Sequence, residues 1–161
     1  MRKYYTAIAM VAVIGIVLFA GVCHAQGLDE KVKTAMKMLQ EKTAALGQAR
    51  FEGNMFYLGD TEMNGNYEVV DEVANNNGCT ATIFAAAGED YRRISTNVIK
   101  EGSRAVGTIL DPNGPAIKKI KVGEAYYGEA DILGNKYQTG YEPIKDPDGK
   151  VIGILYVGYK I

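Results

Sequence analysis

The sequence predicts an α+β fold in which one long helix covers one face of an antiparallel sheet. Apolar residues recur every three or four positions over residues 28–46, and from residue 79 onward they tend to recur every second position. About five strand-like runs follow this change of period, with short helices inserted among them. A helix and a sheet that each have one apolar face bury those faces against each other, which gives a layered domain.

The predicted long helix spans residues 28–46. Its inward-facing positions have three-and-four spacing: Leu28, Val32, Ala35, Met36, Leu39, Thr43 and Leu46. The segment is rich in strong helix formers, and Gly47 ends it because glycine readily adopts the left-handed conformation that stops helices. We interpret Met36 and Met38 as side chains that fill the core.

The rest of the chain predicts shorter elements. Residues 51–66 are polar and punctuated by glycine, as in a short hairpin, and residues 67–78 predict a short helix that ends at Gly78. The segment 103–110 fits either a strand or a turn, and it leads into a short helix within residues 111–123 that starts at a proline. The predicted strands lie in residues 79–88, 89–99, 124–145 (two strands) and 150–159.

Residues 146–149 read Asp-Pro-Asp-Gly and predict the turn between the last two strands. Pro147 fixes φ for one turn position, and Gly149 takes the left-handed position that closes the turn. The stretch also resembles the start of a calcium-binding loop. Lys150 stands where a further oxygen ligand is needed, and the glutamate that completes such loops is missing. We therefore interpret the stretch as a turn and predict no metal site.

The N-terminus has the pattern of a targeting segment. Two basic residues precede an uncharged run over residues 4–23, and small residues follow. This pattern predicts a signal peptide over residues 1–25, cleaved after Ala25. The uncharged run is close to the ~20 residues that span a bilayer, so an uncleaved N-terminal anchor is the alternative. In both cases we expect residues 28–161 to form one extracytoplasmic, periplasmic domain.

Charge and the scarcity of cysteine and histidine exclude several classes of function. The net charge is −1, with no basic stripe of the kind that binds nucleic acid. Cleavage would leave Cys79 as the one cysteine, so no internal disulfide can form, and the single histidine, His24, belongs to the targeting segment. Histidine-dependent triads, haem attachment and most zinc sites need residues that the mature chain lacks. The sequence therefore predicts a protein that is not an enzyme and has no cofactor.

Two arginines are candidate anchors for an anionic ligand. In the predicted strand 89–99, a period of two puts four side chains on one face: Tyr91, Arg93, Ser95 and Asn97. An arginine on a half-buried strand suits a carboxylate because its planar guanidinium donates two parallel hydrogen bonds. The alternative for Arg93 is a surface ion pair with Glu89 or Asp90. Arg104, beside a loop, is the second candidate, with a solvated side chain as the alternative.

A cluster of tyrosines is the second binding feature. The last three predicted strands contain Tyr126, Tyr127, Tyr137, Tyr141, Tyr156 and Tyr159. Tyr137, Thr139 and Tyr141 share one face by alternation. Buried tyrosine rings whose hydroxyl groups point at a ligand suit a pocket wall, and aromatic packing between strands is the alternative. The predicted ligand-binding set is Arg93, Arg104, Asn97, Tyr127, Tyr137, Thr139 and Tyr141.

Several motifs in series carry a family resemblance. They are GNYEVVDEV, GCTATIF, RRISTNV, RAVGT and GEAYYGEADILGNKYQTGYEPIKDPDGKVIGILYVG, within residues 28–159. This series resembles the single Cache domain of bacterial extracytoplasmic sensors, in particular the chemoreceptor-type Cache 3/Cache 2 branch. The resemblance implies a PAS-like fold, with a long N-terminal helix packed on a five- to six-stranded antiparallel sheet and a small-molecule pocket on the sheet face.

The resemblance also implies a function. Members of the family typically bind small metabolites, often short carboxylates, and Arg93 matches the arginine of the family's R-[VI]-A-T-N-V stretch. We therefore expect a sensing module for a small organic acid that works with a membrane-bound signalling protein. Because the chain ends at Ile161, we expect no output domain of its own. The alternative is a structural or adaptor module that forms a homodimer through helix 28–46 and binds no small ligand.

Overall fold

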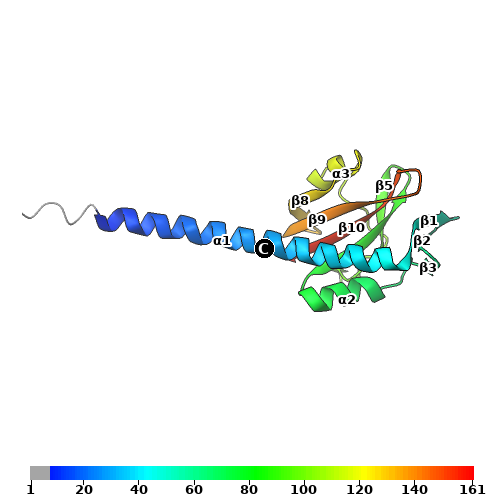
Figure 1. Ribbon diagram of the computed structural model, residues 1–161, viewed down its shortest axis with the longest axis horizontal. Helices are drawn as coiled ribbons and strands as arrows, with labels where there is room; N and C mark the ends of the chain where they lie inside the picture. The colour runs from blue at the N-terminus through cyan, green and yellow to red at the C-terminus, as the bar shows by residue number, and fades with distance from the viewer. Residues whose placement is uncertain (1–7) are drawn as a thin grey trace, which may run out of the picture.

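The computed structural model describes the backbone of residues 8–161 and the side chains of residues 27–161. Its elements are, in order, α1 (Ile8–Leu46), β1 (Ala49–Glu52), β2 (Met55–Leu58), β3 (Thr61–Glu62), α2 (Glu68–Asn77), β4 (Thr80–Ala87), β5 (Asp90–Thr96), β6 (Ile99–Lys100), β7 (Ser103–Arg104), α3 (Pro115–Ile120), β8 (Tyr126–Ile132), β9 (Asn135–Lys145) and β10 (Val151–Lys160). Figure 1 shows the C-terminal half of α1 lying across the main sheet, with α2 beside it and α3 next to β8. The predicted α+β, PAS-like fold is confirmed.

The predicted signal peptide or anchor over residues 1–25 lies outside the residues whose side chains the structure describes. Its cleavage after Ala25 therefore stays a prediction. In the described part of the chain, no helix is both long enough and apolar enough to cross a membrane.

The main sheet has five antiparallel strands in the order β5-β4-β10-β9-β8. The last strand of the chain, β10, is therefore the central strand, and it pairs with β4 on one side and with β9 on the other. A central strand is covered on both faces, which explains why residues 151–157 form a nearly continuous apolar run. The prediction of an antiparallel sheet is confirmed, and its core strand lies at the C-terminal end of the chain.

α1 packs on this sheet through the side chains that its spacing predicted. Val32, Ala35, Met36 and Leu39 are fully buried in the core between helix and sheet, whereas Met38 is partly buried at its edge. Removing each large apolar side chain from water contributes roughly 1.5–3 kcal/mol, so this face holds the helix on the sheet.

A small three-stranded sheet, β1-β2-β3, follows α1 directly and adds one short strand to the predicted hairpin. Gly59, in the turn between β2 and β3, lies against the end of α1. Its φ is +56°, and a Cβ atom at this position would overlap the carbonyl oxygen of Leu46. Glycine at position 59 therefore allows the small sheet to close on the helix.

The sequence of segment 103–110 fitted either a strand or a turn, and the structure contains both there. β6 and β7 form a short hairpin, and the chain then runs along the outer edge of β5. The N–H of Arg93 donates to the carbonyl of Thr108, and the N–H of Leu110 donates to the carbonyl of Tyr91, each at 2.9 Å. The segment thus pairs with backbone groups that an uncovered edge strand would leave open.

The Asp-Pro-Asp-Gly stretch is a tight turn between β9 and β10, as predicted. The Asp146 carboxylate accepts hydrogen bonds from the N–H groups of Asp148 at 3.0 Å and Lys150 at 2.9 Å, and Gly149 has φ +82°. Among residues 27–161, no group of three or more His, Cys, Asp or Glu side chains is placed to hold a metal ion.

Cys79, between α2 and β4, is buried and is expected to be unreactive in the folded protein. Burial raises the pKa of its thiol to about 11, and the thiolate is the form that reacts. At pH 8 a thiol reagent should modify the native protein on the order of a hundredfold more slowly than the denatured protein. Comparable rates for the two states would contradict the burial of this thiol.

Candidate functional site

The face of the main sheet that is turned away from α1 carries an aromatic and polar cluster. The strand register places Tyr141 opposite both Tyr156 on β10 and Tyr126 on β8. The ring centres of Tyr141 and Tyr156 are 5.0 Å apart, and both side chains are fully buried. Phe84 on β4 and Arg93 on β5 are paired in register and continue the same face. A ligand site could therefore form on this face of the sheet.

Arg93 is buried on this face without an acidic partner. The residue is 3 % exposed, and none of the salt bridges within residues 27–161 involves it. Its Nη1 donates to Thr108 Oγ1 at 2.7 Å, and its guanidinium lies 4.8 Å from the centre of the Phe84 ring. Its buried Nε has no hydrogen-bond acceptor in the described structure. The alternative of a surface ion pair with Glu89 or Asp90 is therefore wrong.

This environment is unfavourable for a cation. Burial lowers the pKa of the Arg93 guanidinium, and the nearby phenols of Tyr141 and Tyr156 partly oppose that effect. Burying an unpaired charge costs several kcal/mol, whereas a desolvated cation–π contact contributes about 2 kcal/mol. An anion placed beside Arg93 would therefore stabilise the folded protein.

Arg93 borders a cavity of about 250 Å³. The other walls come from Tyr141 on β9, from residues 109–111 and 114–116 before and within α3, and from residues 130–133 at the end of β8. A cavity of this volume has room for several water molecules. The cavity therefore suits a small metabolite.

Tyr141 supplies a neutral hydroxyl group to the same cavity. Burial raises the pKa of its phenol well above the usual value, and the neighbouring Tyr156 phenol adds to the shift. The hydroxyl group is therefore protonated at neutral pH and can donate a hydrogen bond to an anion. The structure thus brings two of the predicted site residues, Arg93 and Tyr141, to one cavity.

Tyr137 and Thr139 share the face of Tyr141 but do not border the Arg93 cavity. Tyr137 is partly buried at the side of the aromatic cluster. Thr139 is fully buried, and its hydroxyl group donates to the carbonyl of Gly128 at 2.6 Å. A role for these two residues in ligand binding stays a prediction.

Tyr127 lies on the opposite, helix-covered face of the sheet. Its register partner is Gly140, and a Cβ atom at position 140 would lie 2.8 Å from the Tyr127 ring and 2.9 Å from Val32 on α1. The Tyr127 hydroxyl donates to the carboxylate of Glu142 at 2.7 Å. The structure therefore does not bring Tyr127 together with Arg93.

A β-bulge in β5 changes the faces that simple alternation predicts for this strand. Arg93 is opposite Phe84 and Ser95 is opposite Ile83, so Ile94 is the extra residue between two adjacent pairs. Ser95 consequently shares the helix-covered face with Ile83. The prediction that Ser95 lies on the same face as Arg93 is wrong, because a bulge resets the period of two.

Asn97, beyond the bulge, extends the pairing of β4 and β5 with its side chain. Its Oδ1 accepts a hydrogen bond from the N–H of Ala81 at 2.7 Å, and its Nδ2 donates to the carbonyl of Cys79 at 3.2 Å. These contacts end the pairing of β4 with β5. Asn97 does not border the Arg93 cavity.

Arg104 joins the β6–β7 hairpin to α2. Its Nη1 and Nη2 donate to the two carboxylate oxygens of Asp71 at 2.7 and 2.9 Å, and its guanidinium lies 4.3 Å from the centre of the Tyr67 ring. Nη1 also donates to the carbonyl of Thr96 at 2.8 Å. Arg104 is thus neither the solvated side chain of the alternative prediction nor a second arginine at the Arg93 cavity.

The family model of the Cache 3/Cache 2 fusion domain matches residues 23–161. The chain belongs to this family. None of the curated proteins matches the chain. Cache domains are extracytoplasmic sensing modules of signalling receptors that bind small molecules, and they are typically not enzymes.

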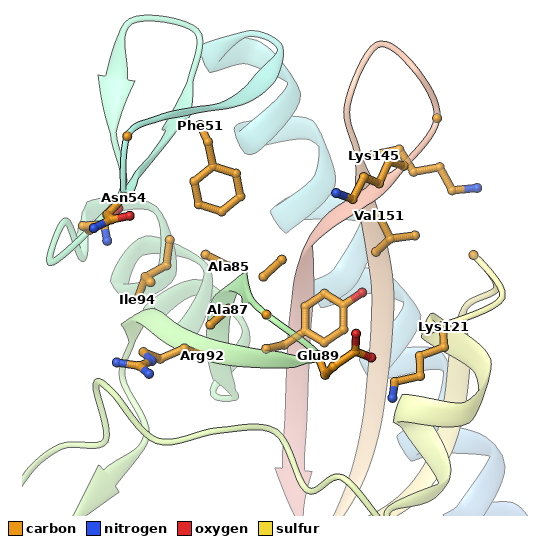
Figure 2. Close-up of a pocket in the computed structure, with 18 of the residues that line it drawn as sticks. Phe51, Asn54, Ala85, Ala87, Glu89, Arg92, Ile94, Lys121, Lys145 and Val151 are labelled. Carbon is orange, nitrogen blue, oxygen red and sulfur yellow. The ribbon is translucent and has the colours of Figure 1, made fainter.

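This Cache domain also has a wider cleft of about 1250 Å³ beside the β4–β5 and β9–β10 turns. Figure 2 shows Phe51 and Asn54 on one side of the cleft and Lys145 and Val151 on the other. Its charged lining residues are Glu89, Arg92, Lys121, Lys145 and Lys150, all of them exposed. Water stabilises these charges, so the cleft lacks the buried, unpaired group that distinguishes the Arg93 cavity.

Sequence reasoning missed the residues that surround Arg93 at its cavity. Phe84 stacks on the guanidinium, Thr108 binds Nη1, and residues 109–116 supply the outer wall. Their approach to Arg93 depends on strand register and on the path of the chain along β5. The one local signal was the segment 103–110, for which the sequence supported both a strand and a turn.

Proposed function

We propose that this Cache domain binds a small carboxylate in the Arg93 cavity and serves as the ligand-binding part of a signalling system. The observation that carries the proposal is a fully buried arginine with an unpaired Nε at the wall of a cavity. The bound carboxylate would take the place of the acidic partner that Arg93 lacks.

The contacts of Arg93 favour one mode of binding. Thr108 holds Nη1, and Nε is buried beyond the reach of a molecule in the cavity, which leaves Nη2 as the guanidinium nitrogen for a ligand. Nη2 can donate a charge-assisted hydrogen bond to a carboxylate, and the protonated hydroxyl of Tyr141 can donate a second. Hydrogen bonds to charged groups contribute roughly 1.5–3 kcal/mol, which corresponds to about ten- to a hundredfold in affinity.

The same proposal includes an extracytoplasmic location, reached through a signal peptide or an N-terminal anchor, and a membrane-bound signalling protein as partner. Support comes from the uncharged segment over residues 4–23 and from α1, which continues from Ile8 into the helix packed on the sheet. The adaptor alternative has less support, because ion pairs within α1 occupy its exposed side, Lys33 with Glu30 and Lys37 with Glu41.

A thermal-shift screen with small organic acids and amino acids tests the proposal. A ligand at a hundred times its Kd should stabilise the protein by about 2.7 kcal/mol, which raises Tm measurably. Arg93→Ala should abolish this rise because it removes the anchor. Arg92→Ala is the matched control: it removes an exposed arginine from the neighbouring position of β5 and should keep the rise.

Two results would contradict the proposal. If Arg93→Ala binds the same acid as tightly as the wild type does, the anchor lies elsewhere. If no acid in the screen changes Tm, the domain is better explained as an interaction module.

A further inference from the structure

Three lysines gather at one end of the main sheet, where they border the wide cleft. Lys121 follows α3, Lys145 ends β9, and Lys150 precedes β10. A Cβ atom at Gly123 would lie 3.2 Å from Nζ of Lys145, so this ammonium group lies against the loop that carries Lys121. Lys150 directly precedes Val151, the register partner of Lys145. The fold thus brings cations from three elements to one cleft.

These lysines have no acidic partner among residues 27–161, because none of the salt bridges there involves them. Glu124, close to Lys121 in sequence, is paired with Lys119 at 2.7 Å. Glu89 is the single acidic residue that borders the cleft, whereas Arg92 adds a further cation across it (Figure 2). A positive cleft therefore lies in a protein whose net charge is −1. A cleft lined by one sign of charge attracts a ligand of the opposite sign.

Apolar side chains border the same cleft. Phe51 is 37 % exposed, and its ring packs edge-on against the buried ring of Phe56, with the ring centres 5.3 Å apart. This contact holds Phe51 in place. Val122, beside Lys121, is 69 % exposed. Residues 85–88 are three alanines and a glycine, and their small side chains leave the cleft open.

The chemistry of the cleft favours an acidic peptide as its occupant. Carboxylates pair with the lysines, and an apolar side chain can cover Phe51 and Val122. The Asn64 Oδ1 accepts a hydrogen bond from the N–H of Phe56 at 2.8 Å, so its amide nitrogen is directed elsewhere and can donate to a peptide carbonyl. An anionic polysaccharide could satisfy the lysines but has no apolar group for Phe51. The volume of about 1250 Å³ also exceeds the ~1,000 Å³ upper range of small-molecule pockets.

The position of the cleft favours a partner that comes from solution. Figure 1 shows β1, β2 and β3 and the turn between β9 and β10 at the end of the domain opposite to the N-terminal part of α1. An anchor or signal peptide at the N-terminus would therefore lie far from the cleft and leave it accessible.

From these features we propose that the wide cleft docks an acidic segment of a soluble partner protein. Carboxylates of the segment lie on Lys121, Lys145 and Lys150, and an apolar side chain lies on Phe51 and Val122. None of the residues that border this cleft also borders the Arg93 cavity, so the proposal is independent of the carboxylate site.

Fluorescence anisotropy of labelled probes tests the proposal on the purified protein. The first probe is a short peptide of Asp, Glu and Gly with one central Phe, and the second has Ser in place of that Phe. The third is polygalacturonate, a polysaccharide that carries carboxylates. The Phe peptide should bind about tenfold more tightly than either of the others, because its ring is buried against apolar side chains. Raising the salt from about 50 to about 300 mM should weaken its binding about tenfold.

Charge reversal tests the role of the lysines. Lys121→Glu combined with Lys145→Glu should weaken binding of the Phe peptide tenfold or more, since like charges then face each other. Lys121→Gln with Lys145→Gln, which only removes the charges, should weaken it less. Lys136→Glu with Lys160→Glu is the matched control. It makes the same change in net charge with exposed lysines at the other ends of β9 and β10, and it should keep the affinity within about twofold.

Four results would overturn the proposal. They are no binding of the Phe peptide at low salt, equal binding of the Ser peptide, and an unchanged affinity in either double lysine variant of the cleft. The fourth is binding of polygalacturonate at least as tight as that of the Phe peptide, which would assign the cleft to anionic polysaccharides. None of these results would affect the outcome of the screen with small acids.

Discussion

Replacing Arg93 by methionine is expected to leave the unliganded protein at least as stable as the wild type, although the position is almost completely buried. Methionine has a similar length and no charge, so it removes the cost of burying an unpaired guanidinium. Exchange of buried ionic groups for apolar ones of similar volume is often neutral or stabilising by roughly 1–4 kcal/mol. Thr108 is not left unsatisfied, because its hydroxyl still donates to the carbonyl of Ala105 at 2.7 Å.

Urea unfolding without ligand measures this effect directly. Arg93→Ala is the comparison, since it removes the same charge but leaves a void, and it should be less stable than Arg93→Met by about 2 kcal/mol or more. If Arg93→Met itself loses more than about 2 kcal/mol, the fold already stabilises the guanidinium and the argument for a missing anion fails.

Gly59→Ala is expected to be among the most damaging single substitutions, with a loss of more than about 3 kcal/mol in the free energy of unfolding. Two effects combine at this position. The φ of +56° strains any residue with a Cβ atom, and that atom would overlap the backbone carbonyl of Leu46 at the end of α1. Backbone atoms cannot move aside as a flexible side chain can, so the small sheet would have to separate from the helix.

Gly53→Ala separates the two effects. Gly53, in the β1–β2 turn, has nearly the same φ, +57°, but no atom lies within 4 Å of the position of an added Cβ. It should therefore cost only the strain, about 1 kcal/mol. Equal losses in urea unfolding for the two variants would show that the contact between Gly59 and Leu46 does not constrain the fold.

The parts of this fold that sequence predicts well are those whose cause is local. The helix over residues 28–46 is fixed by the difference between its two faces, and the turn at 146–149 by the conformations that proline and glycine favour. The run over residues 151–157 could be identified as a strand because its side chains are apolar on both faces. Its central place in the sheet could not be predicted, because it depends on pairing with segments far away in the chain.

The candidate site also depends on pairing between distant segments, so sequence predicts it less well than the helix and the turn. Tyr126 and Tyr127 are neighbours on a strand, so only one of them can share the sheet face of Tyr141, and the register of β8 with β9 places Tyr126 there. The bulge at Ile94 has no local signal and moves the following side chains of β5 to other faces. Pairs with large separations in sequence escape prediction for the same reason, and Arg104 with Asp71 is an example.

Consecutive residues of β9 belong to two different surfaces. Tyr141 borders the Arg93 cavity, while the residues on either side of it, Gly140 and Glu142, face α1. Gly140 lies directly under Val32 of the helix, and Gln138 two residues earlier donates a hydrogen bond to Asp29. One peptide unit therefore separates Tyr141 from the residue on which Val32 of α1 packs. A single strand, with no loop between them, thus carries both a residue at the cavity and the residues under α1.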